Sequence, residues 1–186
     1  MVTEKEKIYY ELLVLRCQRR EKDALEELIH SWEKRLFYYV RRLVNDEQDA
    51  WDILQEIWLK VIYGIKNLRE PCKLPVWLYR IARNTAMSHL RKEIGIRKMY
   101  KEKEKIVPEG ENSDEFQFED AERIHQALTR ISLPHREVLT LYFLEDLSVE
   151  EIAHIVDVPV GTIKSRLHYA KRALGEILKK KGVNYE

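Results

Sequence analysis

The sequence has few of the residues that interrupt helices and no pattern that builds sheets. Its 186 residues include six glycines and five prolines, and no long run alternates β-branched with polar residues, which is the main sequence signal of strands. We therefore expect an all-α fold. No apolar run approaches the roughly 20 residues that a membrane-spanning helix needs, so we expect no insertion into a membrane.

Patterns for metal binding and catalysis are equally scarce. The two cysteines, Cys17 and Cys72, belong to no CxxC pair or Cys/His cluster, which argues against structural zinc and favours a reducing, cytoplasmic setting. Residues 1–7 are charged and lead into an amphipathic pattern, unlike the apolar core of a signal peptide. The chain has no nucleophile motif, no paired acids in an apolar stretch and no glycine-rich phosphate loop. We expect no enzyme, no cofactor and no metal site.

The chain also lacks a large net charge, since its formal charge is only +1. Its charged residues are nevertheless unevenly distributed along the sequence. Residues 91–105 contain seven Lys or Arg and three Glu, whereas residues 109–122 contain seven acids and no base. Turn formers and charges over 107–114 predict a flexible linker. Helical periodicity covers 5–44 with a break near 19–23, then 45–63, 75–93 and about 118–180. The sequence therefore predicts two small helical domains, 1–94 and 119–186, joined by a linker at 95–118.

The end of the chain has the pattern of a helix-turn-helix. Ser148 and Glu151 have the spacing of a capping box before an apolar stripe, and residues 157–159 break the pattern. Asp157 stands where many such units have glycine, and aspartate tolerates the left-handed conformation better than most residues. The next helix has apolar residues on one side, at Ile163, Leu167, Ala170, Leu174 and Ile177. Its opposite face is polar and basic, which predicts entry into the DNA major groove. An exposed surface helix without DNA is the alternative.

Acidic residues dominate the stretch 45–56, which contains five acids and no base. Asp49, Asp52 and Glu56 are spaced to share one outward stripe, with Gln55 beside them. Negative charge at a helix start complements the helix dipole, but this explains Glu56 less well than the first acids. A metal site is a further alternative, although this stretch contains no histidine. The third alternative is that this acidic stripe binds a basic surface of a partner.

The helix expected from Trp77 onward has an arginine-rich side. Its buried side is expected to contain Leu78, Ile81, Ala82 and Thr85. The other side groups Arg80, Arg83, Asn84, Met87 and Arg91. Arginines beside an amide and an apolar side chain suit a melted DNA strand with an extruded base, and a solvated arginine face is the alternative. Trp77 and Tyr79 are interpreted as core or rim, and Trp32, Tyr38 and Tyr39 as core.

Taken in order, three motifs resemble those of extracytoplasmic-function sigma factors. Residues 49–56 resemble region 2.2, and residues 77–84 resemble regions 2.3 and 2.4. Residues 133–174 resemble region 4, through Leu133-Pro134, Arg136, Leu139, Leu147-Ser148, 151–153, Val158-Pro159, 161–167 and 170–174. The chain departs from the family at Ser88, where aspartate is frequent, and in the loop 65–76, which lacks the usual phenylalanine and contains Pro71, Cys72 and Pro75.

The resemblance implies a sigma factor that binds core RNA polymerase and directs initiation at promoters with −35 and −10 elements. The implied polymerase contacts are the β′ clamp helices, bound by Asp49, Asp52, Gln55 and Glu56, and the β flap. The implied −10 residues are Arg80, Arg83, Asn84, Met87 and Arg91, with Asn84 holding a flipped base. The implied −35 residues are Thr162, Lys164, Ser165, Arg166, His168, Tyr169, Lys171 and Arg172. The family also implies an anti-sigma factor as partner, and a linker that passes near the polymerase active-site cleft.

Two other functions compete with this interpretation. A stand-alone helix-turn-helix regulator would bind an operator as a dimer, but it would not need the acidic helix or the long linker. A helical adaptor would use its basic and acidic faces for proteins only, and salt-dependent DNA binding would argue against it.

Overall fold

The computed structural model describes residues 4–44, 46–101 and 128–180, and the regular elements among them are all helical. The expected all-α class is thus confirmed. The α-helices are α1 (Glu4–Gln18), α2 (Ala24–Leu43), α3 (Glu47–Gly64), α4 (Leu74–Lys101), α6 (Leu133–Leu139), α7 (Val149–Val156) and α8 (Val160–Lys180). Three short turns complete them: the 3-10 turns η1 (Ile65–Asn67) and η2 (Pro71–Lys73), and the π-helical turn η3 (Thr140–Leu144).

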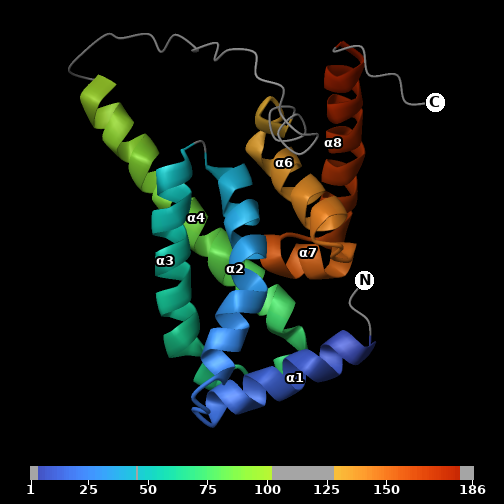
Figure 1. Cartoon of the computed structure of the whole chain (residues 1–186). Helices are drawn as coiled ribbons and strands as arrows, with labels where there is room; N and C mark the ends of the chain where they lie inside the picture. Colours follow the sequence, from blue (N-terminus) through green and yellow to red (C-terminus); the bar gives the residue numbers. More distant parts are fainter. Residues whose placement is uncertain (1–3, 45, 102–127, 181–186) are drawn as a thin grey trace.

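The first half of the chain, residues 4–101, is a helical bundle. Helices α2, α3 and α4 pack together, and α1 crosses one end of them (Figure 1). Trp32 lies at the centre, where its ring meets those of Tyr10 and Tyr79 at centroid distances of 5.5 and 5.9 Å. The side-chain amide of Gln18 donates hydrogen bonds to the carbonyls of Ile65 and Leu68. These bonds tie the loop between α3 and α4 to α1.

Helix α4 is longer than the sequence pattern indicates. Periodicity predicts an end near residue 93, but the helix runs to Lys101, seven residues into the predicted linker. Residues 94–101 include Arg97, Lys98, Met99 and Lys101, which are good helix formers, and the one glycine among them costs only about 1 kcal/mol. The rest of the predicted linker, with the predicted restart near Phe118, lies outside the described residues.

The aromatic residues of α2 divide between core and surface. Trp32 and Tyr39 are buried as predicted, but the prediction for Tyr38 is wrong, because 55% of that residue is exposed. Buried positions on α2 follow the helical spacing 32, 36, 39, 40 and 43, and position 38 lies to the side of that face. In α4, Tyr79 is buried and Trp77 is partly buried, as expected.

The second half, residues 128–180, forms a smaller bundle of α6, η3, α7 and α8. Ile163, Leu167 and Ala170 of α8 are buried, while Leu174 and Ile177 pack at the edge of the core. The apolar side predicted for the last helix is therefore confirmed. Among the described residues, no helix combines the length and apolar character that crossing a bilayer requires.

The two halves touch each other directly. Helix α7 packs against α4, and α6 with η3 packs against α2 (Figure 1). The sequence predicts two domains joined by a flexible linker, but it does not reveal this contact between them.

Candidate nucleic-acid and polymerase interfaces

Local hydrogen bonds set the turn between α7 and α8. The Ser148 hydroxyl accepts a hydrogen bond from the Glu151 amide at 3.2 Å, and the Glu151 carboxylate accepts one from the Ser148 amide at 2.8 Å. This capping box begins α7. The helix ends at Asp157, whose φ of 59° and ψ of 53° are left-handed, and the amides of Asp157 and Val158 both donate to the Ala153 carbonyl. Both features match the sequence prediction and define a helix-turn-helix.

The outer face of α8 presents most of the residues predicted to bind the −35 element. Those that are exposed are Lys164, Ser165, His168, Tyr169, Lys171 and Arg172, and Thr162 is partly buried. The ammonium of Lys171 lies over the rings of Tyr142 and Phe143, at 5.4 and 5.1 Å. Arg172 pairs with Glu176 at 3.6 Å on the surface, which restrains it only weakly. The face is polar, basic and accessible.

Arg166 differs from the other residues of this set. It is partly buried, and its positive charge is close enough to Glu137 of α6 to favour the ionised form of that carboxyl. Its charge therefore acts on a carboxyl at the junction of the two halves.

The residues predicted to bind the −10 element lie along α4, near the second half. Arg80, Asn84 and Arg91 are exposed, and Met87 is partly buried. Arg91 donates a hydrogen bond from Nε to the Met87 carbonyl at 3.1 Å. Arg83 is partly buried and pairs with Glu137 of the second half at 2.9 Å. Arg83 is thus engaged by a carboxylate across the junction.

The acidic stripe of α3 is exposed as the sequence predicts, except that Asp49 is partly buried. Asp46 caps the helix by accepting hydrogen bonds from the amides of Gln48 and Asp49. Asp52, Gln55 and Glu56 face solvent. A hydrogen bond and the positive charge of Lys60, 2.7 Å away, hold the pKa of Glu56 below its usual range.

Two apolar side chains extend this stripe. Leu59 and Tyr63 are exposed, Tyr63 by 74%, and they follow Asp52 at i+7 and i+11 on the same side of α3. Sequence reasoning missed them because Leu and Tyr next to buried positions resemble core residues. The outward face of α3 is therefore acidic at one end and apolar at the other.

The fold also brings a histidine to the acidic helix. The predicted absence of a metal site relied partly on the lack of histidine in 45–56, but His89 of α4 lies 4.0 Å from the Asp49 carboxylate. With Glu93, the possible ligand atoms lie within 4.8 Å of one another. All three residues are partly exposed, and exposed groups of this kind often meet without an ion, so we assign no metal to them.

Comparison with known proteins places both halves in one family. Residues 28–94 match the sequence model of sigma-70 region 2, and residues 121–174 match that of sigma-70 region 4. The RNA polymerase sigma-H factor of Pseudomonas aeruginosa is 31% identical over 183 residues, covering 89% of this chain and 92% of that protein. The ECF RNA polymerase sigma-E factor of Escherichia coli K12 is 32% identical over 181 residues, covering 91% and 94%.

The chain belongs to the extracytoplasmic-function sigma factors. It is therefore a promoter-recognising initiation factor of RNA polymerase and not an enzyme. Region 2 is matched by residues 28–94 of the first half, and region 4 by residues 121–174.

Solved structures agree with this family. The sigma factor RpoE of Bartonella quintana, determined in complex with the anti-sigma factor NepR, matches with a TM-score of 0.71 and 25% identity, over 84% of this chain and 98% of that one. CnrH, determined in complex with the cytosolic domain of CnrY, has the same fold, with a TM-score of 0.67 and 17% identity over 92% and 97% of the two chains.

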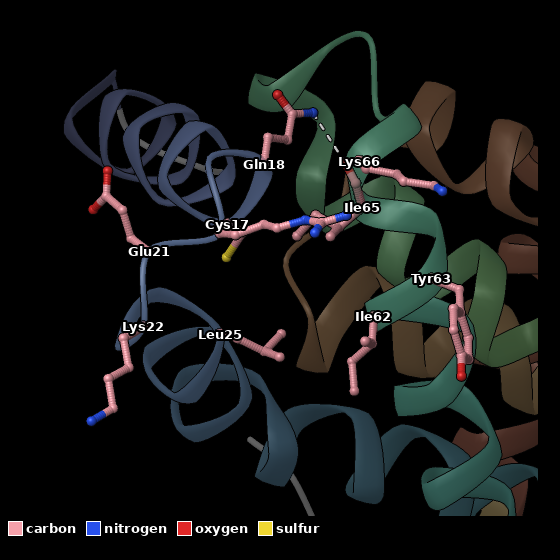
Figure 2. Close-up of a pocket in the computed structure, with 10 residues that line it drawn as sticks. Cys17, Gln18, Glu21, Lys22, Leu25, Ile62, Tyr63, Ile65 and Lys66 are labelled. Atoms are coloured by element: carbon pink, nitrogen blue, oxygen red, sulfur yellow. Dashed lines mark hydrogen bonds between the residues drawn. The ribbon is translucent and has the colours of Figure 1, made fainter.

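A pocket of about 640 Å³ in region 2 has no catalytic arrangement among the described residues that line it. It lies between the turn that joins α1 to α2 and the end of α3, with Cys17, Leu25 and Ile62 on its walls (Figure 2). Burial raises the pKa of the Cys17 thiol, which reduces the thiolate fraction and makes it a poor nucleophile.

Proposed function

We propose that this sigma factor uses three separate helical faces in initiation. The acidic stripe of α3 binds the polymerase, α8 reads the −35 element as duplex, and α4 reads the −10 element as a melted strand. We place region 2 at 1–94, the linker at 95–118 and region 4 at 119–186. Its action is in the cytoplasm, where polymerase and chromosomal promoters meet.

The observation that best supports the proposed function is the geometry of α8, which suits recognition of duplex DNA. The helix follows a helix-turn-helix turn, buries Ile163, Leu167 and Ala170, and turns a basic face outward. A helix about 10–12 Å wide fits the major groove, and its first residues reach base edges. Lys164, Ser165 and His168 are exposed in the first turns of α8 and are assigned to base edges. The residues placed for phosphates are Thr162, Arg166, Lys171 and Arg172, and Tyr169 lies beside them.

Single-strand recognition by α4 is supported by the mixture of side chains on its outward side. Arg80, Arg83 and Arg91 supply cations for phosphates, and Asn84 supplies an amide that can donate to and accept from a base edge. Met87 offers an apolar surface beside them. Asn84 is the residue we assign to the flipped base of the −10 element.

Polymerase binding is supported by the character of the α3 face. Carboxylates at Asp49, Asp52 and Glu56 with the Gln55 amide favour a basic partner, and charge complementarity raises association rates and specificity. The exposed Leu59 and Tyr63 add the apolar area that interfaces bury at their centre. We propose the β′ clamp helices as the partner of this face and the β flap as the partner of region 4.

An anti-sigma factor is a further proposed partner. RpoE of Bartonella quintana, similar over most of this chain, is bound by the anti-sigma factor NepR in its solved structure. A protein that covers the α3 face would keep this sigma factor from the polymerase.

Run-off transcription tests the proposed function. Purified core polymerase is combined with a genomic promoter library, with and without this protein, and the products are sequenced. We expect a set of transcripts that appears only with the protein, from start sites with shared −35 and −10 sequences. Transcription that is unchanged by the protein would contradict the proposal.

The residues of α8 are expected to separate by role. Lys164→Ala should lower recognition at one −35 position by about 1–3 kcal/mol, because a base contact is lost. Lys171→Ala should weaken all promoters alike and reduce the salt slope by about one unit, because a phosphate contact is lost. The measurement is binding and transcription by the holoenzyme on single-base −35 variants at several salt concentrations. A uniform loss across all variants for Lys164→Ala would overturn base reading by this residue.

A further inference from the structure

The pocket beside Cys17 in region 2 is not used by the DNA-binding faces of α4 and α8. It lies where the end of α1, the start of α2 and the end of α3 meet (Figure 2). Its volume of about 640 Å³ falls within the roughly 300–1,000 Å³ of pockets that bind small molecules. The residues that line it therefore indicate what kind of ligand it can hold.

The inner walls of this pocket are aliphatic. Leu25 of α2 and Ile62 of α3 point toward each other across it (Figure 2). Leu25 is partly buried, Ile62 is 39% exposed, and the buried Ile65 lines the pocket as well. A hydrocarbon chain between them would remove apolar surface of both protein and ligand from water, which stabilises a complex.

Hydrogen bonds within the protein hold the pocket in shape. The side-chain amide of Gln18, which lines the pocket, donates to the carbonyl of Ile65 at 3.0 Å and to that of Leu68 at 2.9 Å. Both bonds join the end of α1 to the turn that follows α3. Because they do not involve a ligand, the pocket exists before binding, and little conformational entropy is lost when a ligand enters.

The exposed edge of the pocket is basic. Arg20, Lys22 and Lys66 lie there and are exposed. The one acid that lines the pocket among the described residues, Glu21, pairs with Arg16 at 3.0 Å. In the part of the chain that the structure describes, no carboxylate forms an ion pair with any of the three cations. The edge therefore has an excess of positive charge, which attracts an anion.

Arg20 is held at this edge in an unusual backbone conformation. Its φ is 60°, in the left-handed region, where glycine is favoured because a side chain crowds the neighbouring backbone. The amide of Glu21 donates to the Arg16 carbonyl at 3.1 Å, a bond typical of helices that end with a left-handed glycine. An arginine in this place adds a cation to the pocket and makes the turn more strained, and strained residues cluster at ligand sites.

We propose that this pocket binds a small amphipathic anion, namely a single acyl chain of medium length with a carboxylate head. The chain lies between Leu25 and Ile62, and the carboxylate lies at the edge formed by Arg20, Lys22 and Lys66. Neither part is sufficient alone, because the apolar walls select the chain and the cations select the sign of the head group.

Occupation of the pocket also affects the outward face of α3. Tyr63 lines the pocket and belongs to the apolar end of that face. A chain that lies against Ile62 and Tyr63 covers apolar surface that a partner would otherwise bury, so the bound ligand weakens polymerase binding. This consequence rests on the proposed function of α3, whereas the ligand site does not.

The first test measures binding to the full-length chain by calorimetry, with three ligands below the concentrations at which they form micelles. Decanoate has the chain and the negative head, decyltrimethylammonium has the chain with a positive head, and butyrate has the negative head with a short chain. We expect decanoate to bind at least about tenfold more tightly than either of the others. Methyl NMR should show shifts at Leu25, Ile62 and Ile65. Equal binding of the three ligands, or shifts confined to other methyl groups, would overturn the site.

The second test reverses the charge of the edge. K22E/K66E should weaken decanoate binding about tenfold. K5E/K34E makes the same change of charge at exposed lysines outside the pocket and should bind like the wild type. Circular dichroism verifies folding, and K22Q/K66Q replaces K22E/K66E if that variant does not fold. Equal binding by wild type and K22E/K66E would overturn the role of the cations. Binding to anionic vesicles without binding to decanoate would overturn the pocket as a site for a single acyl chain.

The last test examines the consequence for polymerase. Decanoate should lower the affinity of wild type and of K5E/K34E for core polymerase severalfold, while K22E/K66E should be affected much less. Decanoate that binds in the pocket without changing this competition would overturn the effect on α3. If D52R/E56R also binds core polymerase as tightly as the wild type, the proposed polymerase face is rejected, and the ligand site stands on the calorimetry and the NMR shifts.

Discussion

Replacing Asp52 and Glu56 with arginine is expected to lower the affinity of this sigma factor for core RNA polymerase by about 100-fold. Placing like charges against a basic partner costs several kcal/mol, and roughly 2.7 kcal/mol corresponds to that factor. The fold should be retained, because both side chains are exposed. Among the described residues, the ion pair that is lost is Glu56–Lys60, a surface pair that contributes about 1 kcal/mol or less.

Competition for core polymerase against a labelled reference sigma factor measures this loss. The matched control is Glu26→Arg with Glu33→Arg, which makes the same change of charge on the exposed side of α2. The control should compete like the wild type at each salt concentration. If the Asp52/Glu56 variant competes as well as the wild type, α3 does not belong to the polymerase interface.

Truncating Trp32 to alanine is expected to cause the largest loss of stability among single substitutions in region 2, about 3–5 kcal/mol. The residue is 1% exposed and joins three helices, since its ring contacts Tyr10 of α1 and Tyr79 of α4. The cavity left behind cannot collapse without moving helices that also pack on each other. A loss of this size lowers the melting temperature by on the order of 10 °C, which calorimetry and urea unfolding can measure.

Tyr38→Ala is the control for this prediction, because it removes an aromatic ring from the same helix. Tyr38 is mostly exposed and its ring contacts only Phe37 and Arg42 among the described aromatic and cationic pairs. We expect a loss of about 1 kcal/mol or less. Similar losses for the two variants would contradict the packing of α2.

The sequence by itself determined the features that depend on near neighbours in the chain. Ser148 and Glu151, which form the capping box, are three positions apart, and the left-handed Asp157 directly follows the last residue of α7. Because each feature is local, the sequence alone predicts both. The buried side of α8 follows from helical periodicity. The order of the motifs determined the family, since regions 2 and 4 occur in their usual sequence.

The ends and surfaces of helices were less predictable from local pattern. Helix α4 continues to Lys101 because good helix formers extend past the last amphipathic turn. Tyr38 and Tyr63 look like core aromatics in sequence, but the face of a helix that is buried depends on which neighbours cover it. Periodicity predicts the direction in which the apolar side of a helix faces, but not how many of the neighbouring positions are buried.

Only the tertiary structure decided which charged residues meet. Arg83 and Glu137 are 54 positions apart, and Tyr79 and Glu145 are 66 positions apart. In the sequence these glutamates resemble the exposed acids found throughout the chain. His89 likewise reaches Asp49 only because α3 and α4 lie side by side. Contacts over such separations depend on how whole helices pack.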